Sequence, residues 1–165
     1  MAELGDFMTQ NEIKDLIESL KSGDQNVADV SADDLRGLLD LNPEGPYQFV
    51  NLLKYKKRAD YPEGHSMAHK ELSGQEAYNL YGMVALQQVI KRGGRLMQSN
   101  MVKLSMGGGD WDSVATMEYQ NISAFFDMLV DPDYQAALIH RDAGLEATEV
   151  LVSKPILNGP VGGSA

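Results

Sequence analysis

The sequence of 165 residues contains no cysteine and no long apolar run. The absence of cysteine excludes disulfides, thiolate nucleophiles and thiolate metal ligands. Because no run of about 18 apolar residues is present, no membrane-spanning helix is expected. The first residues also lack the basic start and apolar stretch of a signal peptide. A cytoplasmic protein is the simplest interpretation.

Basic residues are scarce, since 14 Lys and Arg stand against 24 Asp and Glu and the net charge is -10. Binding the phosphates of nucleic acid or of an anionic membrane requires Lys and Arg. We therefore expect neither nucleic acid nor a membrane as a partner. Residues 1–46 contain 11 acidic and 3 basic residues, so the acidity is concentrated there. The simplest interpretation of this acidity is a solvated surface.

The first 45 residues show helical periodicity and predict two short helices. The apolar stripe of the first helix is formed by Ile13, Leu16, Ile17 and Leu20. Gly23 is expected to end this helix. Ser31 is a predicted N-cap of the second helix, with Asp34 three residues later. We expect residues 1–45 to form an acidic helical extension whose apolar stripe docks on the rest of the chain.

The remaining chain alternates strand and helix patterns. Strands are predicted at 47–55, 95–106, 111–120 and 146–155, a helix at 73–94, and two helical pieces separated at Pro132. The order β-α-β-β-α-β predicts an α+β, ferredoxin-like domain over 46–155, with a four-stranded antiparallel sheet and two helices on one face. Residues 156–165 read as a loose tail. The other sheet face, with Met101 and Leu151, requires a cover, and a homodimer packed sheet to sheet would provide it.

The triplet His140-Arg141-Asp142 matches the His-Arg-Asp of a protein-kinase catalytic loop. A kinase also needs a glycine-rich phosphate loop, a strand lysine and a downstream Asp-Phe-Gly. No Asp-Phe-Gly follows Asp142, and "GGGD" at 107–110 lacks the spacing of a phosphate loop. We therefore exclude a kinase. Either His140 and Arg141 complement the dipole at the end of their helix, or they reach a pocket.

Several segments together resemble a known family. They are "FVNLLKY", "GGRLM", "WDSVATMEY", "DPDYQAAL" and "HRDAGLEATEVL". As a set, they resemble the domain of unknown function 1330 family, a member of the dimeric α+β barrel superfamily, over about residues 47–155. The resemblance implies a ferredoxin-like protomer whose sheet packs against that of a second copy. Relatives in the superfamily include cofactor-free monooxygenases, muconolactone isomerase-like enzymes, haem-dependent enzymes and stress-responsive proteins, so the fold does not settle the chemistry.

A ligand in this fold would lie between the helices and the sheet, so polar residues on the inner sheet face are informative. Asn51 shares its strand face with Phe49 and Leu53. It either belongs to a ligand site or is a core amide with satisfied hydrogen bonds. Asn100 is predicted to share a face with Leu96.

The candidate roles follow from the chemistry of the side chains. We expect Asn51 to orient a carbonyl or enolate and Arg141 to hold an anionic group. His140 or Tyr119 would move a proton. The expected substrate-binding residues are Trp111, Tyr134, Tyr78 and Asn100. For Trp111 the alternative interpretation is a residue of the hydrophobic core. An aromatic or lactone-like molecule would suit such walls.

No metal or cofactor is expected. His65 and His69 have the i, i+4 spacing of a metal pair on a helix, but no third ligand is fixed by spacing. A histidine-ligated haem is considered only by analogy with the superfamily. Two functions stay open: a cofactor-free enzyme, isomerase-like or monooxygenase-like, and a non-enzymatic ligand-binding or stress-related module. An enclosed pocket would favour the enzyme, whereas a filled core with an exposed apolar patch would favour the module.

Overall fold

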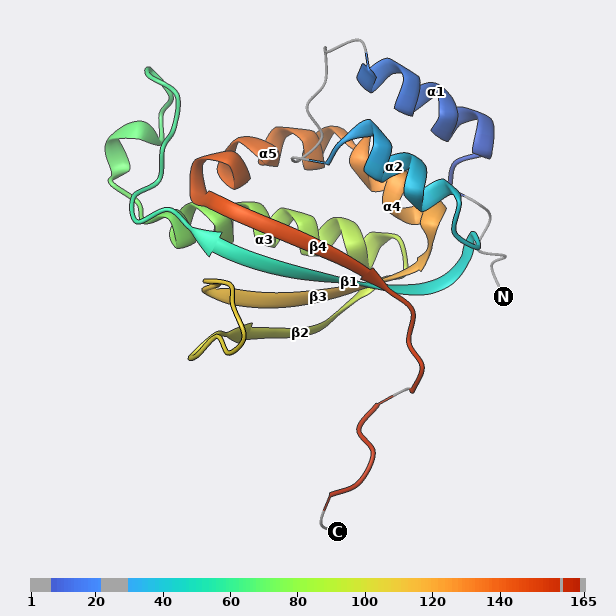
Figure 1. The fold of residues 1–165 in the computed structure, drawn as a ribbon. Coiled ribbons are helices and arrows are strands. Elements are labelled where there is room, and N and C mark those ends of the chain that lie inside the picture. The colour runs from blue at the N-terminus through green and yellow to red at the C-terminus, as the bar shows by residue number, and fades with distance from the viewer. Residues whose placement is uncertain (1–6, 22–29, 158, 164–165) are drawn as a thin grey trace.

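The computed structural model describes residues 7–21, 30–157 and 159–163. Its centre is a four-stranded antiparallel sheet with the strand order β2-β3-β1-β4 (Figure 1). The strands are β1 (Glu44–Tyr55), β2 (Arg95–Met101), β3 (Ser113–Asn121) and β4 (Leu145–Ser153). The helices that follow β1 and β3 are α3 (Gly74–Lys91), α4 (Ile122–Leu129) and α5 (Pro132–Gly144), with a short 3-10 turn, η1 (Ala68–Lys70). The α+β, ferredoxin-like fold is therefore confirmed.

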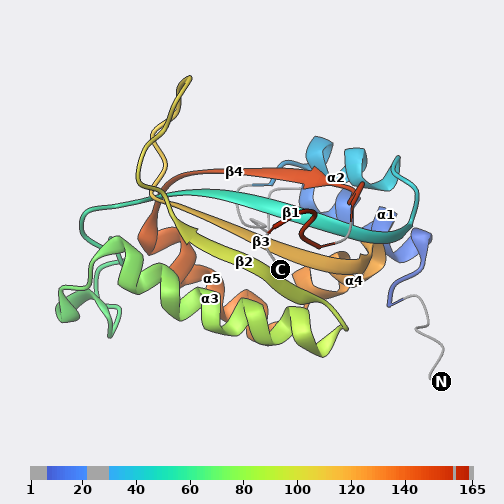
Figure 2. The same cartoon turned by 90° about the horizontal axis from the view of Figure 1, so that it is seen from below.

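The helices cover one face of the sheet, and no described helix crosses the other face (Figure 2). Strand register fixes which side chains face the helices, because directly paired residues of antiparallel strands point to the same face. Phe49 pairs with Met117 and Val152, and Asn51 pairs with Ala115 and Val150. These positions form the inner face, as the alternation in β1 predicts.

Helix boundaries are fixed by local hydrogen bonds. A capping box between Ser73 and Glu76 begins α3, as predicted. Asp131 caps α5 and Pro132 occupies its first turn, so the predicted break at Pro132 is confirmed. Gly74 and Gly144 lie where α3 and α5 meet, and a Cβ added at Gly144 would lie 2.4 Å from the carbonyl oxygen of Gly74. The close approach of these two helices requires glycine there.

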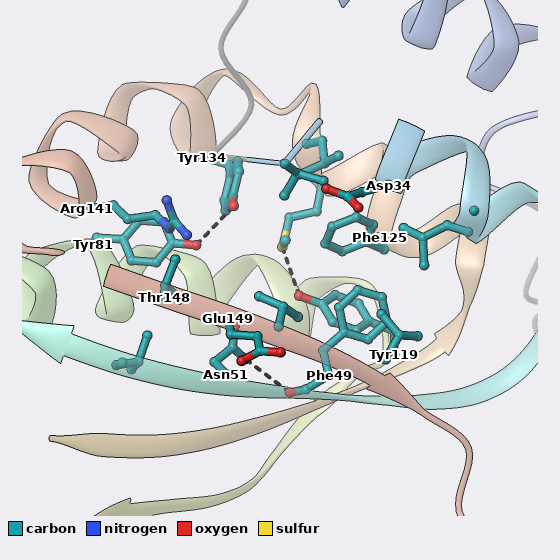
Figure 3. A pocket seen from close by; sticks show the side chains of 18 of the residues that line it. Asp34, Phe49, Asn51, Tyr81, Tyr119, Phe125, Tyr134, Arg141, Thr148 and Glu149 are labelled. Carbon is teal, nitrogen blue, oxygen red and sulfur yellow. Dashed lines mark hydrogen bonds between the residues drawn. The ribbon is translucent and has the colours of Figure 1, made fainter. Parts of the chain in front are cut away.

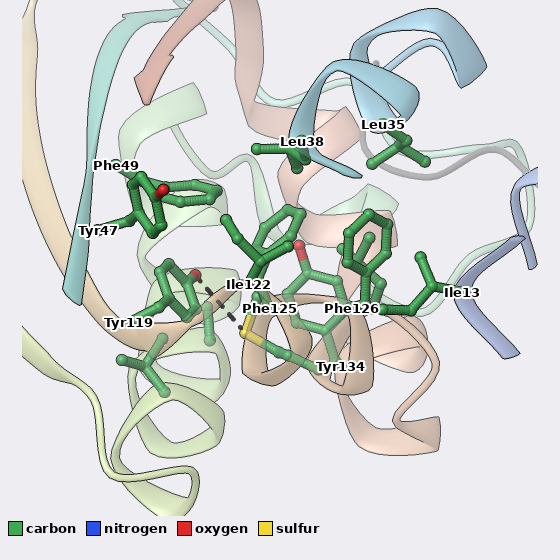
Figure 4. Packing of buried hydrophobic residues seen from close by; sticks show 14 of the residues in the cluster. Ile13, Leu35, Leu38, Tyr47, Phe49, Tyr119, Ile122, Phe125, Phe126 and Tyr134 are labelled. Carbon is green, nitrogen blue, oxygen red and sulfur yellow. Dashed lines mark hydrogen bonds between the residues drawn. The ribbon is translucent and has the colours of Figure 1, made fainter. Parts of the chain in front are cut away.

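The N-terminal helices α1 (Gln10–Lys21) and α2 (Ala32–Leu39) pack on the same core as the sheet (Figure 4). The predicted capping box of Ser31 and Asp34 begins α2. Ile13 and Ile17 of α1 are buried, which confirms docking of this stripe, while the side chain of Leu20 and residue Gly23 lie outside the described residues. The division into extension, domain and tail stays a prediction.

The core is mainly aromatic and aliphatic. Its fully buried members include Phe126, Ile17, Leu35, Met128 and Leu129. A buried arginine, Arg92, links the end of α3 to the α4–α5 connection. Its guanidinium donates to Asp127 at 2.7 Å and to Asp131 at 3.1 Å. This charge pairing holds the helical layer together at the end of the sheet where β2 begins.

The predicted facing of β2 holds at Leu96 but is wrong after it. The pairing of β2 with β3 shifts between Leu96 and Gln98, so Leu96 pairs with Met117 whereas Asn100 pairs with Val114. A β-bulge adds one residue, and one residue reverses the facing of the following side chains. Asn100 therefore points away from the helices. Met101 points toward them, so it does not share the outer face with Leu151.

Strand limits also differ from the prediction at two places. β2 ends at Met101 rather than at residue 106, and β3 begins at Ser113, after Trp111. Three successive glycines, Gly107 to Gly109, have positive φ angles and form the turn of an irregular arm. No helix among the described residues is long and apolar enough to cross a membrane.

Candidate functional site

A cavity of about 730 Å³ lies between α2, the α3–α5 layer and the inner faces of β1 and β4 (Figure 3). Most of its lining is aromatic or aliphatic, with a few polar groups. This is the usual composition of a small-molecule site. Of the predicted site residues, five line it: Asn51, Tyr78, Tyr119, Tyr134 and Arg141.

One end of the cavity is polar. Arg141 of α5 is only 6% exposed, and its guanidinium lies near the hydroxyl of Tyr81 on α3. The Tyr81 hydroxyl lies 3.0 Å from that of Tyr134. Arginine can only donate, and the bond between the two phenols uses only one of their two protons. One phenolic proton of this pair is therefore available to a group in the cavity.

The tyrosines at the site are neutral hydrogen-bond donors. Burial raises the pKa of Tyr78, Tyr81, Tyr119 and Tyr134, and the guanidinium of Arg141 only partly offsets this for Tyr78, Tyr81 and Tyr134. Removing their protons would place a phenolate in an apolar environment. These side chains can stabilise an anionic or carbonyl oxygen, but they do not act as bases near neutral pH.

Asn51 sits on the sheet beneath the cavity. Its side-chain NH2 group donates to the carbonyl oxygens of Phe49 and Ala115, both at 3.1 Å. These two bonds fix the orientation of the amide. Among the described residues no donor reaches its side-chain oxygen, and this oxygen can accept a hydrogen bond from a ligand.

The other end of the cavity is aromatic. The Phe49 ring lies 4.7 Å from those of Tyr119 and Phe125, measured between centroids. Among the described residues the Tyr119 hydroxyl hydrogen-bonds only to the sulfur of Met128, at 3.8 Å. Sulfur is a weak acceptor, so this hydroxyl can turn to a better one. Figure 3 shows these rings beside one another, away from Arg141 and Tyr134.

The mouth of the cavity is framed by α2 and β4. The residues of α2 that line it recur at helical spacing: Asp33, Asp34, Gly37, Leu38 and, just beyond the helix, Leu41. From β4 the lining includes Thr148, Glu149, Val150 and Val152. The mouth is therefore acidic, while the only cationic side chain among the described lining residues is the buried Arg141.

Three predicted site residues lie elsewhere. Asn100 faces away from the helices because of the bulge in β2. Trp111 precedes β3, and its indole lies against Gly109 in the glycine turn. His140 lies beside the cavity-facing Arg141 in sequence, but it is turned about 100° around the helix, away from the cavity. None of the three lines the cavity.

His140 instead joins a second cluster beneath the 56–72 loop. Its Nδ1 atom lies 2.7 Å from the hydroxyl of Tyr61, whose ring stacks on His65. Burial, and secondarily the charge of His65, lowers the pKa of His140. Together with Ala143, Tyr61 belongs to a small apolar core that holds the loop against α5. The contacts of His140 are therefore with the loop residues that pack on α5, and not with the cavity.

Several lining residues were not predicted. Tyr81 is three residues after Tyr78 on the same face of α3, so helical spacing from Tyr78 is a signal that would have found it. Asp34 and Glu149 left no such signal, because their position depends on how α2 docks beside β4. Among the described residues no group of three or more His, Asp or Glu could hold a metal ion, and His65 and His69 do not form such a group.

Comparison with solved structures identifies similar chains. The crystal structure of methylated RPA0582 protein matches with a TM-score of 0.70 at 30% identity, covering 81% of this chain and 97% of that chain. A second structure of RPA0582, a protein of unknown function from Rhodopseudomonas palustris, matches with a TM-score of 0.69 at 28% identity, over 81% of this chain and 100% of that chain.

A third match is much weaker. A dimeric protein of unknown function with a ferredoxin-like fold from Bacteroides fragilis NCTC 9343 aligns with a TM-score of 0.38 at 13% identity, over 68% of this chain and 99% of that one. This likeness is too distant to support an inference. No family model and no curated protein matches the chain. These two comparisons therefore do not confirm the resemblance to the domain of unknown function 1330 family.

Proposed function

We propose that this chain, which belongs to the same family as the RPA0582 protein of Rhodopseudomonas palustris, binds a small organic molecule in the cavity beneath α2. The ligand carries a carbonyl or anionic group and an apolar body, as an aromatic or lactone-like compound does. The observation that carries this proposal is the buried Arg141 beside the Tyr81–Tyr134 pair, at one end of an otherwise apolar cavity.

Physical reasons support binding at this place. A guanidinium offers several fixed donors to an oxyanion, and a hydrogen bond to a charged group stabilises more than a neutral one. The two phenols and the amide of Asn51 add neutral groups that fix the orientation of a ligand. A cavity of about 730 Å³ lies within the usual range for small-molecule sites.

The test is a ligand-observed NMR screen of aromatic carboxylates, lactones and cyclic ketones against the purified chain. Arg141→Gln is expected to weaken binding of the best anionic ligand by about tenfold or more. Arg58→Gln is the matched control, since Arg58 is an exposed arginine paired with Glu71 outside the cavity. Equal binding by wild type and Arg141→Gln would contradict the proposal.

A milder variant tests the same site without removing a buried charge. Tyr134→Phe deletes one hydroxyl of the phenol pair and is expected to weaken ligand binding severalfold. Tyr47→Phe is the control, because Tyr47 is also buried but donates to the carbonyl of Asn42 away from the cavity. Loss of binding in Tyr47→Phe, or none in Tyr134→Phe, would argue against a site at the phenol pair.

A cofactor-free enzyme, isomerase-like or monooxygenase-like, is the second candidate. It is favoured by the convergence of a guanidinium and neutral phenols, which would stabilise an enolate as it forms. Proton transfer would fall to the carboxylates at the mouth, because Tyr119 holds its proton and His140 lies outside the cavity. The test is deuterium exchange next to the carbonyl of a bound lactone or ketone. Exchange no faster than in buffer would contradict the enzyme proposal and would leave ligand binding as the function.

Two further expectations belong to the same proposal. We propose a homodimer in which the helix-free sheet faces pack together, as the resemblance to the dimeric α+β barrel superfamily implies. Leu151 on that face is 47% exposed, which supports a cover there. Membership of the domain of unknown function 1330 family and a cytoplasmic location stay predictions.

A further inference from the structure

The cavity is electrically asymmetric. At its inner end the guanidinium of Arg141 is buried and permanently charged. At its mouth stand two acidic side chains of α2, Asp33 and Asp34. The positive charge is deep and the negative charges are at the rim, so a ligand that spans the cavity meets opposite charges at its two ends.

The acidic side chains at the mouth differ in how far they are already engaged. Asp33 pairs with Arg36 on the outer side of α2. One oxygen of Asp34 accepts from the backbone and hydroxyl of Ser31, and no bond among the described residues uses its other oxygen. Glu149 of β4 pairs with Leu52, so its side chain points to the helix-free face of the sheet and not into the cavity. Asp34 is therefore the acidic group that faces the outer end of a ligand.

Between the two ends the walls are aromatic. Phe49, Tyr119 and Phe125 pack around one region of the cavity, and Leu38 and Val152 add aliphatic contacts. Aromatic rings pack favourably against one another in offset or edge-to-face arrangements. The middle of the cavity is thus suited to one ring or a body of similar width.

We infer that the ligand is a monocarboxylic acid with an aromatic body and a neutral or cationic outer end. The carboxylate lies at Arg141 and the phenol pair, the ring lies among the aromatic walls, and the outer end faces Asp34. This inference rests on the proposed binding function and adds the class and orientation of the ligand. A second carboxylate at the outer end is rejected by like-charge repulsion at the mouth.

The test uses three probes that share a phenylacetate core and carry a different charge at the outer end. They are phenylacetates with an aminomethyl, a methyl or a carboxylate group at the para position, which makes that end cationic, neutral or anionic. Their affinities are measured by calorimetry at low salt, because charges near a surface are screened by salt. The affinity is expected to be highest for the cationic probe, intermediate for the neutral probe and lowest for the anionic probe. The highest and lowest affinities should differ by about tenfold or more.

A matched pair of single variants assigns the effect to the mouth. Asp34→Asn removes the negative charge that faces the ligand and is expected to reduce the spread of affinities among the probes to less than about threefold. The control, Asp40→Asn, makes the same charge change at the other end of α2, at a residue that does not line the cavity. The control is expected to keep the order and most of the spread. Equal spreads in the two variants would overturn the role of the mouth.

The outcomes separate this inference from the proposed function. If the three probes bind equally, or the anionic probe binds best, the ligand class is wrong while binding in the cavity stands. If lactones or ketones bind but no phenylacetate does, the ligand class is again overturned. If nothing in either set binds, both the inference and the proposed function are overturned.

Discussion

The arginine at the inner end of the cavity shows how neighbouring residues of one helix acquire different settings. Arg141 lines the cavity, whereas His140, one position earlier, contacts Tyr61 beneath the loop. The difference follows from the rotation of about 100° per residue in an α-helix. The notion that His140 exchanges protons with a ligand therefore has no geometric support.

The setting of His140 predicts a pH effect on stability rather than on ligand binding. Its pKa is lowered in the folded state, so the unfolded state takes up a proton first as the pH falls below the ordinary value of 6.5. Stability contributed by the neutral imidazole is present above that value and is lost as the pH falls through the lowered pKa. The unfolding free energy should therefore decrease between about pH 7.5 and about pH 5.5.

Urea unfolding of wild type and His140→Asn at both pH values measures this contribution. The variant is expected to lose less stability over that range, because it lacks the imidazole. His69→Asn serves as the control, since His69 is exposed on η1 and makes no hydrogen bond to the described residues. Identical pH dependence in His140→Asn and wild type would show that His140 does not cause the effect.

At the scale of elements, the contact between α3 and α5 is set by glycine. Gly144 ends α5 against the first turn of α3, where a Cβ would lie 2.4 Å from the Gly74 carbonyl oxygen and 2.8 Å from the Tyr78 nitrogen. The helices must approach this closely for Tyr78 of α3 and Arg141 of α5 to line one cavity. The packing of two helix ends thus positions the site.

Gly144→Ala is expected to destabilise the chain by about 1–3 kcal/mol, because backbone atoms must move apart to accept the methyl group. Gly82→Ala is the matched control in the middle of α3, where an added Cβ meets nothing within 4 Å. It should stabilise by about 0.5–1 kcal/mol through helix propensity. Urea unfolding measures both. A loss in Gly144→Ala no larger than about 0.5 kcal/mol would contradict the steric argument.

The second element of interest is α2, which provides one side of the mouth. Its cavity-facing positions recur every three or four residues, whereas Leu35 packs into the core. The helix therefore has two tasks: Leu35 and Leu38 anchor it, and Asp34 with Gly37 borders the opening. The acidic N-terminal segment is thus part of the candidate site and not only a solvated surface.

At the scale of the whole molecule, the sheet has one face under helices and one without. The face without helices carries Val50, Leu52, Val114 and Leu151, flanked by polar groups such as Glu118, which is buried by Arg95 and Gln48. Antiparallel sheets commonly leave one face to solvent, so this face is not by itself an interface. The proposal of a dimer is therefore open to a direct test.

Leu151→Asp places a charge on this face and is expected to convert a dimer to monomers at micromolar concentration. Light scattering coupled to size-exclusion chromatography gives the mass of each species. Met83→Asp is the control, since Met83 is an exposed apolar residue of α3 on the helical side. A wild-type chain that elutes as a monomer over the same concentrations would rule out the sheet-to-sheet dimer.

Local interactions explain what the sequence alone determined. Helix starts at Ser31, Ser73 and Pro132 follow from caps and first-turn residues that act within four positions. The two-residue period of β1 places Asn51 on the inner face, and helical spacing places Arg141 with Tyr134. The order of elements then determines the ferredoxin-like sheet, because few other connections are allowed.

Tertiary structure decided the features that depend on distant parts of the chain. The bulge in β2 arises from its pairing with β3, and it turned Asn100 away from the predicted pocket. The Tyr81–Tyr134 hydrogen bond joins residues 53 positions apart, and Asp34 lines the same cavity as Val150 and Val152 because α2 docks beside β4. Spacing along the chain carries no information on such contacts, because they form only when separate elements pack against a common core.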